Sequence, residues 1–427
     1  MSFEFSEAGC RIAQGSGIGE LMDDLGEALA DGGDKIRMLG GGQPALIPEV
    51  DAIWRRRMEE ILAEDGSLQS MLSIYEAPAG GRKFRSAVAG SLSKEFDWDL
   101  TEENISVTPG GQCAFFFLFN LLAGAMPDGR HRKILLPLMP EYIGYSDQGM
   151  DGDVFLATKP KIEELGEREF KYRIDFEAVE KAVESADIGA ICASRPTNPS
   201  GNVLTDNEVE KLRDLARRLG VPFILDNAYG APFPGILFEE VRPVWDEGMI
   251  LTLSLSKIGL PGTRTGIVVS SPEIARALSS MTAIVGLANN NIGQAIVTPL
   301  FESGEILEVS RDLVRPYYRG RCERAKSIFL DTLPEDIEWR MHSAEGALFL
   351  WLWFPGLPIT SKKLYARLKA RGVLVIPGEY FFFGLHDPDW AHRHECIRVS
   401  YAMDEQTVVE GAKAIAEEVS RAFSEAC

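Results

Sequence analysis

The sequence predicts an α/β protein with two domains, and three observations support this prediction. Between Ile105 and Ser256, short runs rich in Val, Ile and Leu end in small or polar residues and alternate with longer helix-like stretches. Past about Arg311 this rhythm changes, because a long polar helix is followed by separate short apolar runs. The 427 residues are also enough for two or three domains at about 150 residues each.

The expected strands of the first domain are apolar enough to be buried on both faces, as the strands of a parallel sheet are. They are residues 105–108, 133–138, 188–193, 221–225 and 249–255. Residues 206–219 form an amphipathic stretch with Thr205 or Asp206 as the candidate N-cap and Gly220 at its end. This stretch is therefore predicted to be a crossover helix.

The second domain is expected to be smaller and to contain its own strands. Its apolar runs are residues 347–353, 373–376 and 397–399. We expect residues 49–310 to form the larger domain, residues 311–427 the smaller one, and the glycine-rich residues 1–48 to pack on the smaller domain.

Composition excludes several functions. The 44 basic and 64 acidic residues give a formal net charge of -20, which opposes binding to nucleic acid. The start lacks the features of a signal peptide, and the longest apolar stretch, residues 347–354, is shorter than the ~20 residues that span a bilayer. Six scattered cysteines contain no Cys-x-x-Cys pair. We therefore expect a cytoplasmic protein with neither nucleic acid nor a membrane as partner.

Three polar segments each follow a predicted strand at its carboxyl end, where open α/β sheets bind ligands. They are residues 194–201, 226–229 and 254–257. Together they bring an amide, an acid, a phenol and an amine to one crevice, in the side chains of Asn198, Asp226, Tyr229 and Lys257.

These four groups suit pyridoxal 5'-phosphate. Burial would favour a neutral Lys257 amine, which can form a covalent imine with the cofactor. A buried Asp226 needs a cation, and the protonated pyridine nitrogen supplies one. Tyr229 and Asn198 can hydrogen-bond the phenolic oxygen of the ring. Lys257, Asp226 and Tyr229 are therefore the predicted catalytic residues.

The cofactor phosphate needs a separate binding site. A glycine turn after residues 105–108 opens an apolar helix at residues 113–122, and backbone N–H groups at such a helix start bind anions. Hydroxyl groups beside Lys257 and a nearby guanidinium add further donors. The expected phosphate ligands are Gly110, Gly111, Gln112, Ser254, Ser256 and Arg264.

Taken singly, these residues have simpler explanations. Lys257 could be a surface lysine and Asp226 a helix N-cap. Their occurrence together and in order favours the site. Residues 392–396 carry His, Glu and Cys side chains without a second cluster or a ligand spacing, so no metal site is predicted.

Four motifs carry a resemblance to a known family: Leu-Gly-Gly-Gly-Gln-Pro at residues 39–44, Pro-Glu-Tyr-Ile-Gly-Tyr at 140–145, Asp-Asn-Ala-Tyr-Gly at 226–230 and Ser-Leu-Ser-Lys at 254–257. Over residues 15 to 420 the chain resembles the class I aminotransferases of fold type I, and more closely the valine–pyruvate aminotransferases. The resemblance implies a mostly parallel seven-stranded sheet between helices, with a smaller α/β domain. It also implies that L-valine and pyruvate give 3-methyl-2-oxobutanoate and L-alanine.

The same resemblance assigns further residues. Tyr142 would stack on the pyridine ring, and Tyr75 would reach the phosphate of a neighbouring subunit, which implies a homodimer with shared active sites. Arg398, helped by Asn198 and the backbone near Gly42, would bind the substrate carboxylate. Gly111 departs from the family, whose members usually carry a hydroxyl at that place, and this puts one phosphate contact in doubt.

The substrate side chain is expected to be small and apolar. Residues 281–295, where dicarboxylate-specific relatives place a cationic partner, contain no Arg or Lys. Ile18, the Gly40–Gly42 turn and the three phenylalanines at 381–383 are the expected pocket walls. Other aminotransferase specificities (alanine, or aromatic with 2-oxoglutarate), a cysteine-conjugate β-lyase and a ligand-sensing regulator are the alternatives.

Overall fold

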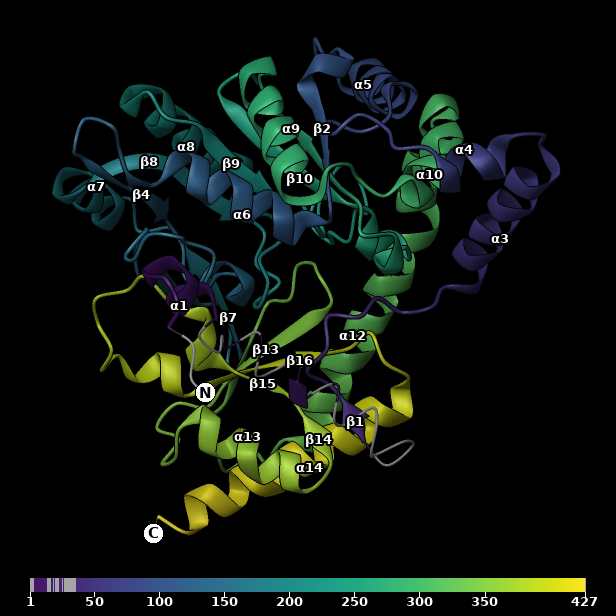
Figure 1. The fold of residues 1–427 in the computed structure, drawn as a ribbon. Helices are drawn as coiled ribbons and strands as arrows, with labels where there is room; N and C mark the ends of the chain where they lie inside the picture. Colours follow the sequence, from purple (N-terminus) through teal and green to yellow (C-terminus); the bar gives the residue numbers. More distant parts are fainter. Residues whose placement is uncertain are drawn as a thin grey trace.

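The structure is a computed structural model that describes residues 4–13, 17, 19, 23–24, 26 and 36–426. Ile18, an expected pocket wall, lies outside the described residues. Figure 1 shows a larger sheet flanked by helices in the upper half and a second sheet in the lower half, with helix α12 (Arg315–Thr332) running beside both. None of the described helices is long and apolar enough to cross a membrane.

The larger sheet follows the order β2-β11-β10-β9-β8-β4-β3, and β5 pairs with β4. Strands β4, β5, β8, β9 and β10 pair in parallel, whereas β11 is antiparallel to both β2 and β10. The strands of this sheet are β2 (Ile105–Thr108), β3 (Gly124–Ala125), β4 (His131–Leu136), β5 (Phe155–Ala157), β8 (Asp187–Ser194), β9 (Phe223–Asp226), β10 (Met249–Ser254) and β11 (Gly266–Val269). Within the described residues it therefore has eight strands, one more than predicted.

The predicted strands and crossover helix are observed, with small shifts at their ends. Strand β9 begins at Phe223 because the Val221 N–H still caps the preceding helix, donating to the Ala216 carbonyl at 3.1 Å. Helix α8 (Asp206–Leu219) has the predicted bounds. Thr205 and Glu208 form a capping box at its start, and Gly220 ends it in a left-handed conformation.

The second sheet has the order β15-β16-β13-β12-β7-β6. Its strands are β6 (Lys161–Glu164), β7 (Glu169–Arg173), β12 (Arg340–His342), β13 (Phe349–Trp353), β15 (Ile376–Pro377) and β16 (Cys396–Ser400), while β1 (Arg37–Met38) pairs separately with β14 (Val373–Leu374). The hairpin β6–β7 comes from within the expected larger domain, yet β7 pairs in parallel with β12. The division at residue 310 stays a prediction, and this hairpin crosses it.

Helices cover the larger sheet and frame the second one (Figure 1). Apolar residues of the strands and of the covering helices form one continuous core. The remaining helices are α1 (Glu7–Ala13), α3 (Pro48–Ala63), α4 (Ser67–Ser73), α5 (Arg82–Phe96), α6 (Gly111–Leu122), α7 (Phe176–Ser185), α9 (Pro272–Gly286), α10 (Asn291–Ser303), α11 (Glu305–Glu308), α13 (Ser361–Ala370) and α14 (Glu405–Ser424).

Candidate active site

The carboxyl ends of three neighbouring strands lie side by side, as the sequence predicted. Parallel pairing places Ser194 of β8 beside Asp226 of β9, and Asp226 beside Thr252 of β10. The loops that follow therefore meet at one edge of the sheet. A cavity of about 360 Å³ lies there, and residues past 311 contribute Arg398, Leu374 and Tyr365 to its wall. This volume is within the usual range for a small-molecule site.

Most of the predicted site residues line this cavity. Gly110, the N-cap of α6, does not, and Tyr75 does not, because it is 83% exposed on the outer surface. The predicted residues that line it are Gly42, Gly111, Gln112, Tyr142, Asn198, Asp226, Tyr229, Ser254, Ser256, Lys257, Arg264 and Arg398.

Lys257 follows β10 in a short 3-10 helix, Leu255–Ile258. Its Nζ donates to the Gly42 carbonyl at 2.6 Å and lies 5.2 Å from the centre of the Tyr229 ring. Burial, followed by repulsion from Arg398 and Arg264, lowers the pKa of Lys257 to about 8. Far more of the amine is therefore neutral near physiological pH than in an ordinary lysine, and the neutral amine is the nucleophile.

Asp226 is a buried carboxylate, with 7% of its surface exposed. Its Oδ1 accepts hydrogen bonds from the Ala228 N–H at 2.8 Å and the Thr252 hydroxyl at 3.1 Å, and its Oδ2 accepts one from the Tyr145 hydroxyl at 2.5 Å. Burial raises its pKa against the effect of these bonds. It forms no salt bridge with any described cation, so a cationic ligand in the cavity would stabilise its charge.

Two tyrosines are fixed on the cavity wall. The Tyr142 ring lies over Gly144, where an added Cβ would come within 2.3 Å of the ring. Tyr229 packs edge-on against Phe349 with ring centres 5.9 Å apart. Burial raises the pKa of the Tyr229 hydroxyl, which keeps it protonated and able to donate.

The start of α6 forms an open cradle beside a guanidinium. Gly110 has φ 83°, and an added Cβ there would lie 2.0 Å from Nη2 of Arg264, so only glycine fits. An added Cβ at Gly111 meets no atom within 4 Å. Arg264 Nη1 donates to the Ser256 hydroxyl at 3.4 Å. The side chain of Gln112 donates to the Gly144 carbonyl at 2.8 Å, so a phosphate contact from Gln112 would use its backbone N–H.

Arg398 is a buried cation on β16, with 3% of its surface exposed. Its guanidinium donates to Asn198 Oδ1 and to the Gly40 carbonyl, both at 2.6 Å. The rings of Phe349 and Phe381 lie 4.0 and 5.3 Å from its carbon Cζ. Burial lowers its pKa to about 10. Because both partners are neutral oxygens, the charge is left for an anion in the cavity.

One prediction about the side-chain pocket is wrong. Phe381, Phe382 and Phe383 do not line the cavity. A 3-10 helix at Gly378–Phe381 turns Phe381 and Phe382 into the core, where they pack on Trp351, and Phe383 is partly buried against Phe155 elsewhere. Residues 281–295 do not line the cavity of their own chain, and their lack of a cationic partner for a second substrate carboxylate stays a prediction. The wall near Gly40–Gly42 is formed instead by Pro44, Ile143, Tyr365 and Leu374.

Sequence reasoning missed Tyr145 and Thr252, the two side chains that hold Asp226. Thr252 carried a signal, because it is a polar residue within an apolar strand that pairs with the strand ending at Asp226. Tyr145 carried a weaker one, since it stands three residues after Tyr142 in the motif at 140–145.

The sequence is also similar to those of known proteins. The family model for aminotransferases of class I and II matches residues 161–415. The chain is 45% identical to the valine–pyruvate aminotransferase of Escherichia coli K12 over 421 residues, which cover 99% of each chain.

Solved structures are similar to this chain as well. A putative amino-acid aminotransferase from Psychrobacter arcticum 273-4 is 45% identical, with a TM-score of 0.95 over 99% of this chain and 100% of the other. The valine–pyruvate aminotransferase from Salmonella typhimurium LT2 is 42% identical, with a TM-score of 0.86 over 96% of this chain and 100% of the other.

Proposed function

The chain belongs to the class I and II aminotransferases, and on that premise we propose that it transfers an amino group from L-valine to pyruvate, forming 3-methyl-2-oxobutanoate and L-alanine. The fold is that of fold type I aminotransferases, and the enzyme depends on pyridoxal 5'-phosphate. The 45% identity over 99% of both chains to a valine–pyruvate aminotransferase is the observation that carries the choice of substrates.

The cavity residues fit this cofactor. The buried Asp226, which forms no salt bridge with a described cation, would hold the protonated pyridine nitrogen, and Tyr142 would cover the ring. Tyr229 and Asn198 would hydrogen-bond its phenolic oxygen. The open cradle at Gly111, which an added Cβ would begin to fill, would hold the phosphate together with the backbone of Gln112 and the side chains of Ser254, Ser256 and Arg264. When bound, pyridoxal phosphate supplies an electron sink for the charge that develops at the substrate α-carbon.

Lys257 performs two tasks in this proposal. Its amine, with a pKa lowered to about 8, would hold the cofactor covalently. When it is free, Nζ would act as the base that moves the proton of the substrate α-carbon. The Gly42 carbonyl, 2.6 Å from Nζ, orients the amine for this transfer.

Arg398 binds the α-carboxylate of the amino acid. Its two hydrogen bonds to Asn198 and Gly40 and the two phenylalanine rings fix the plane of the guanidinium before substrate arrives. A fixed, partly desolvated guanidinium can grip a carboxylate with two parallel hydrogen bonds.

The cavity wall supports a small aliphatic side chain. Beyond Lys257, Arg264 and Arg398, none of the described residues that line the cavity is a cation, so a second substrate carboxylate has no partner there. Pro44, Ile143 and Leu374 provide apolar surface. Such a pocket separates substrates that differ by one methylene by only about 1–3 kcal/mol, so neighbouring aliphatic amino acids should also react.

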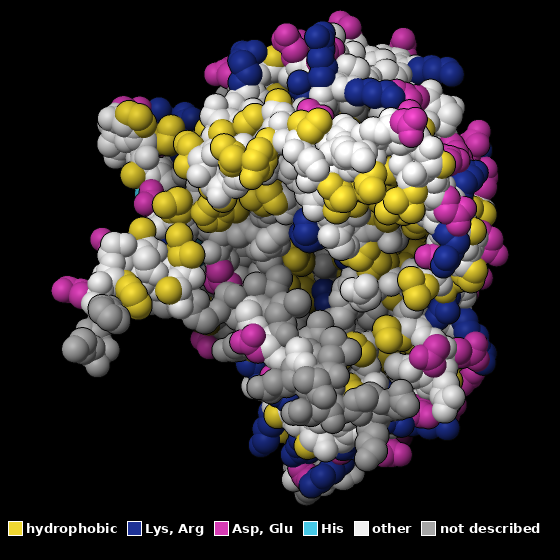
Figure 2. All heavy atoms as spheres, turned by 45° about the vertical axis from the view of Figure 1, so that its right-hand side comes forward, with side chains coloured by type: hydrophobic (Ala, Val, Ile, Leu, Met, Phe, Trp, Pro, Cys, Tyr) yellow, Lys and Arg dark blue, Asp and Glu magenta, His cyan; other side chains and the backbone are white. Residues whose placement is uncertain are grey.

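The enzyme is further proposed to act as a homodimer. Large apolar side chains are exposed along the loop before α3, on α3 and α4 and at the end of α9: Leu46, Leu62, Leu72, Ile74, Tyr75, Ile284, Val285 and Leu287. Figure 2 shows hydrophobic side chains gathered over the upper half of one face, beside a hollow that contains Lys or Arg side chains. A second copy would bury such a surface and bring Tyr75 to the partner's phosphate site.

The proposed location is the cytoplasm. All five cysteines within the described residues are free thiols, three of them fully buried. Reduced cysteines suit that compartment.

Product analysis with purified enzyme tests the activity. L-Valine with pyruvate should give equal amounts of 3-methyl-2-oxobutanoate and L-alanine, and replacing pyruvate with 2-oxoglutarate should lower kcat/KM. Preference for an aromatic or dicarboxylic pair would refute the substrate choice. Release of ammonia and pyruvate from a cysteine conjugate without an added 2-oxo acid would instead support the β-lyase alternative.

A further inference from the structure

Tyr145 lies directly behind Asp226, and the proposed reaction described above gives it no part. It stands in the 3-10 helix Ile143–Tyr145 that follows Tyr142, and its side chain is fully buried. Its hydroxyl donates to Asp226 Oδ2 at 2.5 Å, across 81 residues of sequence. A buried tyrosine hydroxyl normally has a hydrogen-bond partner, but here the partner is the carboxylate proposed to face the cofactor ring.

We infer that Tyr145 is a positioning residue for the cofactor, acting through Asp226. A carboxylate has about four lone-pair sites. The Ala228 N–H and the Thr252 hydroxyl occupy Oδ1, and Tyr145 takes one site on Oδ2. Three donors thus fix the plane of the carboxylate and leave acceptor capacity on Oδ2 for a cationic N–H in the cavity.

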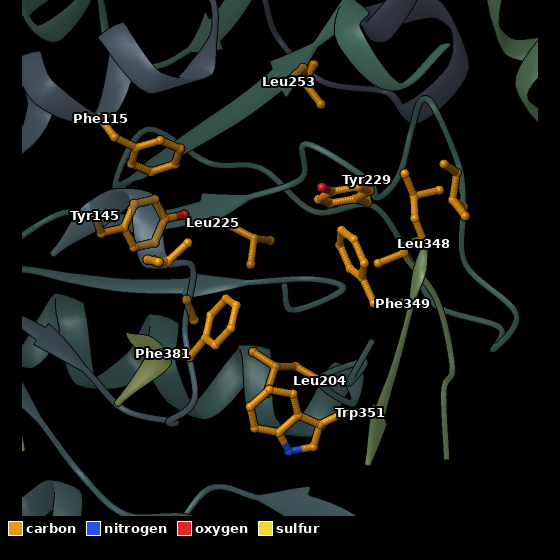
Figure 3. Packing of buried hydrophobic residues seen from close by; sticks show 14 of the residues in the cluster. Phe115, Tyr145, Leu204, Leu225, Tyr229, Leu253, Leu348, Phe349, Trp351 and Phe381 are labelled. Carbon is orange, nitrogen blue, oxygen red and sulfur yellow. The ribbon is translucent and has the colours of Figure 1, made fainter. Parts of the chain in front are cut away.

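The aromatic residues around Tyr145 hold its hydroxyl in place. The rings of Phe115, Phe119 and Tyr142 have centres 4.6, 5.2 and 5.3 Å from that of Tyr145. Figure 3 shows Tyr145 next to Phe115, with its hydroxyl pointing toward the strand that carries Leu225. Phe115 and Phe119 belong to α6, whose first residues form the phosphate cradle, so one side chain connects that helix, Tyr142 and Asp226.

The electrostatics agree with this assignment. Burial raises the pKa of Asp226, and the hydrogen bond from Tyr145 is the first of the contacts that oppose this rise. Burial and the nearby Asp226, Cys192 and Glu141 raise the pKa of Tyr145 well above its usual value, so its hydroxyl remains a donor. Glu141 is buried too, with a pKa raised to about 8 by burial, and adds little charge at neutral pH.

The test is the variant Tyr145→Phe, which removes only the hydroxyl. The dissociation constant of pyridoxal phosphate, measured by titration of the cofactor-free protein, should rise by about 10- to 100-fold, the range for losing one hydrogen bond to a buried charge. The pH midpoint of the bound cofactor's visible absorption should also move upward, because an Asp226 carboxylate that is held less firmly stabilises the ring proton less. For L-valine, kcat should fall while KM stays nearly constant.

Two further variants make the result specific. Tyr172→Phe is a matched control, since Tyr172 is another fully buried tyrosine whose hydroxyl hydrogen-bonds Trp351 and His392 in the second sheet. It should change stability without changing cofactor affinity. In an Asp226→Asn background, Tyr145→Phe should have almost no further effect on that affinity, because the two residues act in series.

Equal cofactor affinity and an equal pH midpoint in wild type and Tyr145→Phe would overturn the inference, and so would an undiminished effect in the Asp226→Asn background. The inference rests on the proposed site for the cofactor. If the wild-type protein itself fails to bind pyridoxal phosphate, that proposal and this inference fall together, whereas normal binding by Tyr145→Phe overturns only the inference.

Discussion

Replacing Arg398 with methionine should abolish most activity while leaving the fold intact. The guanidinium lies in the core with 3% of its surface exposed and has neutral oxygens of Asn198 and Gly40 as its partners. A methionine of similar length would pack between the rings of Phe349 and Phe381 without the cost of a buried charge.

The magnitudes follow from the contacts. Loss of two charge-assisted hydrogen bonds to the substrate carboxylate, at about 1.5–3 kcal/mol each, should lower kcat/KM for L-valine by about 10² to 10⁴-fold. For folding, relief of the buried charge opposes the loss of hydrogen bonds to Asn198 and Gly40. The free energy of unfolding should therefore change by no more than about 2 kcal/mol in either direction.

The assay compares kcat/KM, cofactor affinity and urea unfolding for wild type, Arg398→Met and Arg168→Met. Arg168 is a matched control, because it also donates to backbone carbonyls and lies over an aromatic ring, that of Trp339, but far from the cavity. Arg398→Met should bind pyridoxal phosphate normally, and Arg168→Met should retain kcat/KM. A kcat/KM within threefold of wild type in Arg398→Met would refute the proposed carboxylate clamp.

Three more predictions concern the amine, the cradle and the dimer. Burial lowers the pKa of Lys257 from 10.5 to about 8, so between these pH values the unfolded chain binds more protons than the folded one. The free energy of unfolding of the cofactor-free enzyme should therefore rise with pH over this range. Chemical denaturation should show no such rise in Lys257→Met. Gly110→Ala should lower Tm, because Gly110 has a positive φ and an added Cβ would clash with Arg264. Gly111→Ala should leave Tm unchanged and weaken cofactor binding a few-fold. Thermal melts and cofactor titrations of the two variants would check this contrast. Tyr75→Phe should weaken cofactor binding without changing the dimer mass in light scattering, and unaltered affinity would contradict a shared active site.

Local patterns were sufficient for most of the larger sheet and for α8. Capping residues and hydrophobic periodicity are encoded next to the element they define, which is why Thr205 and Gly220 mark the ends of the helix correctly. Strand β11, only four residues long, was not predicted, because such a short apolar run resembles a piece of buried helix. The place of the β6–β7 hairpin in the second sheet depends on long-range pairing, which neither the exposed, charged residues of β6 nor the mixed residues of β7 reveal.

In the candidate site too, residues placed by local patterns were predicted, and residues placed by long-range contacts were missed. Asn198, Asp226 and Lys257 were predictable because parallel strands end at one edge of a sheet. Tyr145 was not, because its partner is far along the chain and the contact depends on how the loop after β4 folds back. The phenylalanines at 381–383 were misassigned because a single short turn decides whether they face a pocket or the core.

The most direct test of the account is a visible spectrum of the purified enzyme with pyridoxal phosphate, titrated first with L-valine and then with pyruvate. The account predicts that valine converts the lysine-bound cofactor to its amine form, that pyruvate restores it, and that Lys257→Ala binds the cofactor without completing this cycle. A cofactor spectrum in wild type that valine leaves unchanged would contradict the substrate assignment. A complete cycle in Lys257→Ala would contradict the catalytic role of Lys257 itself.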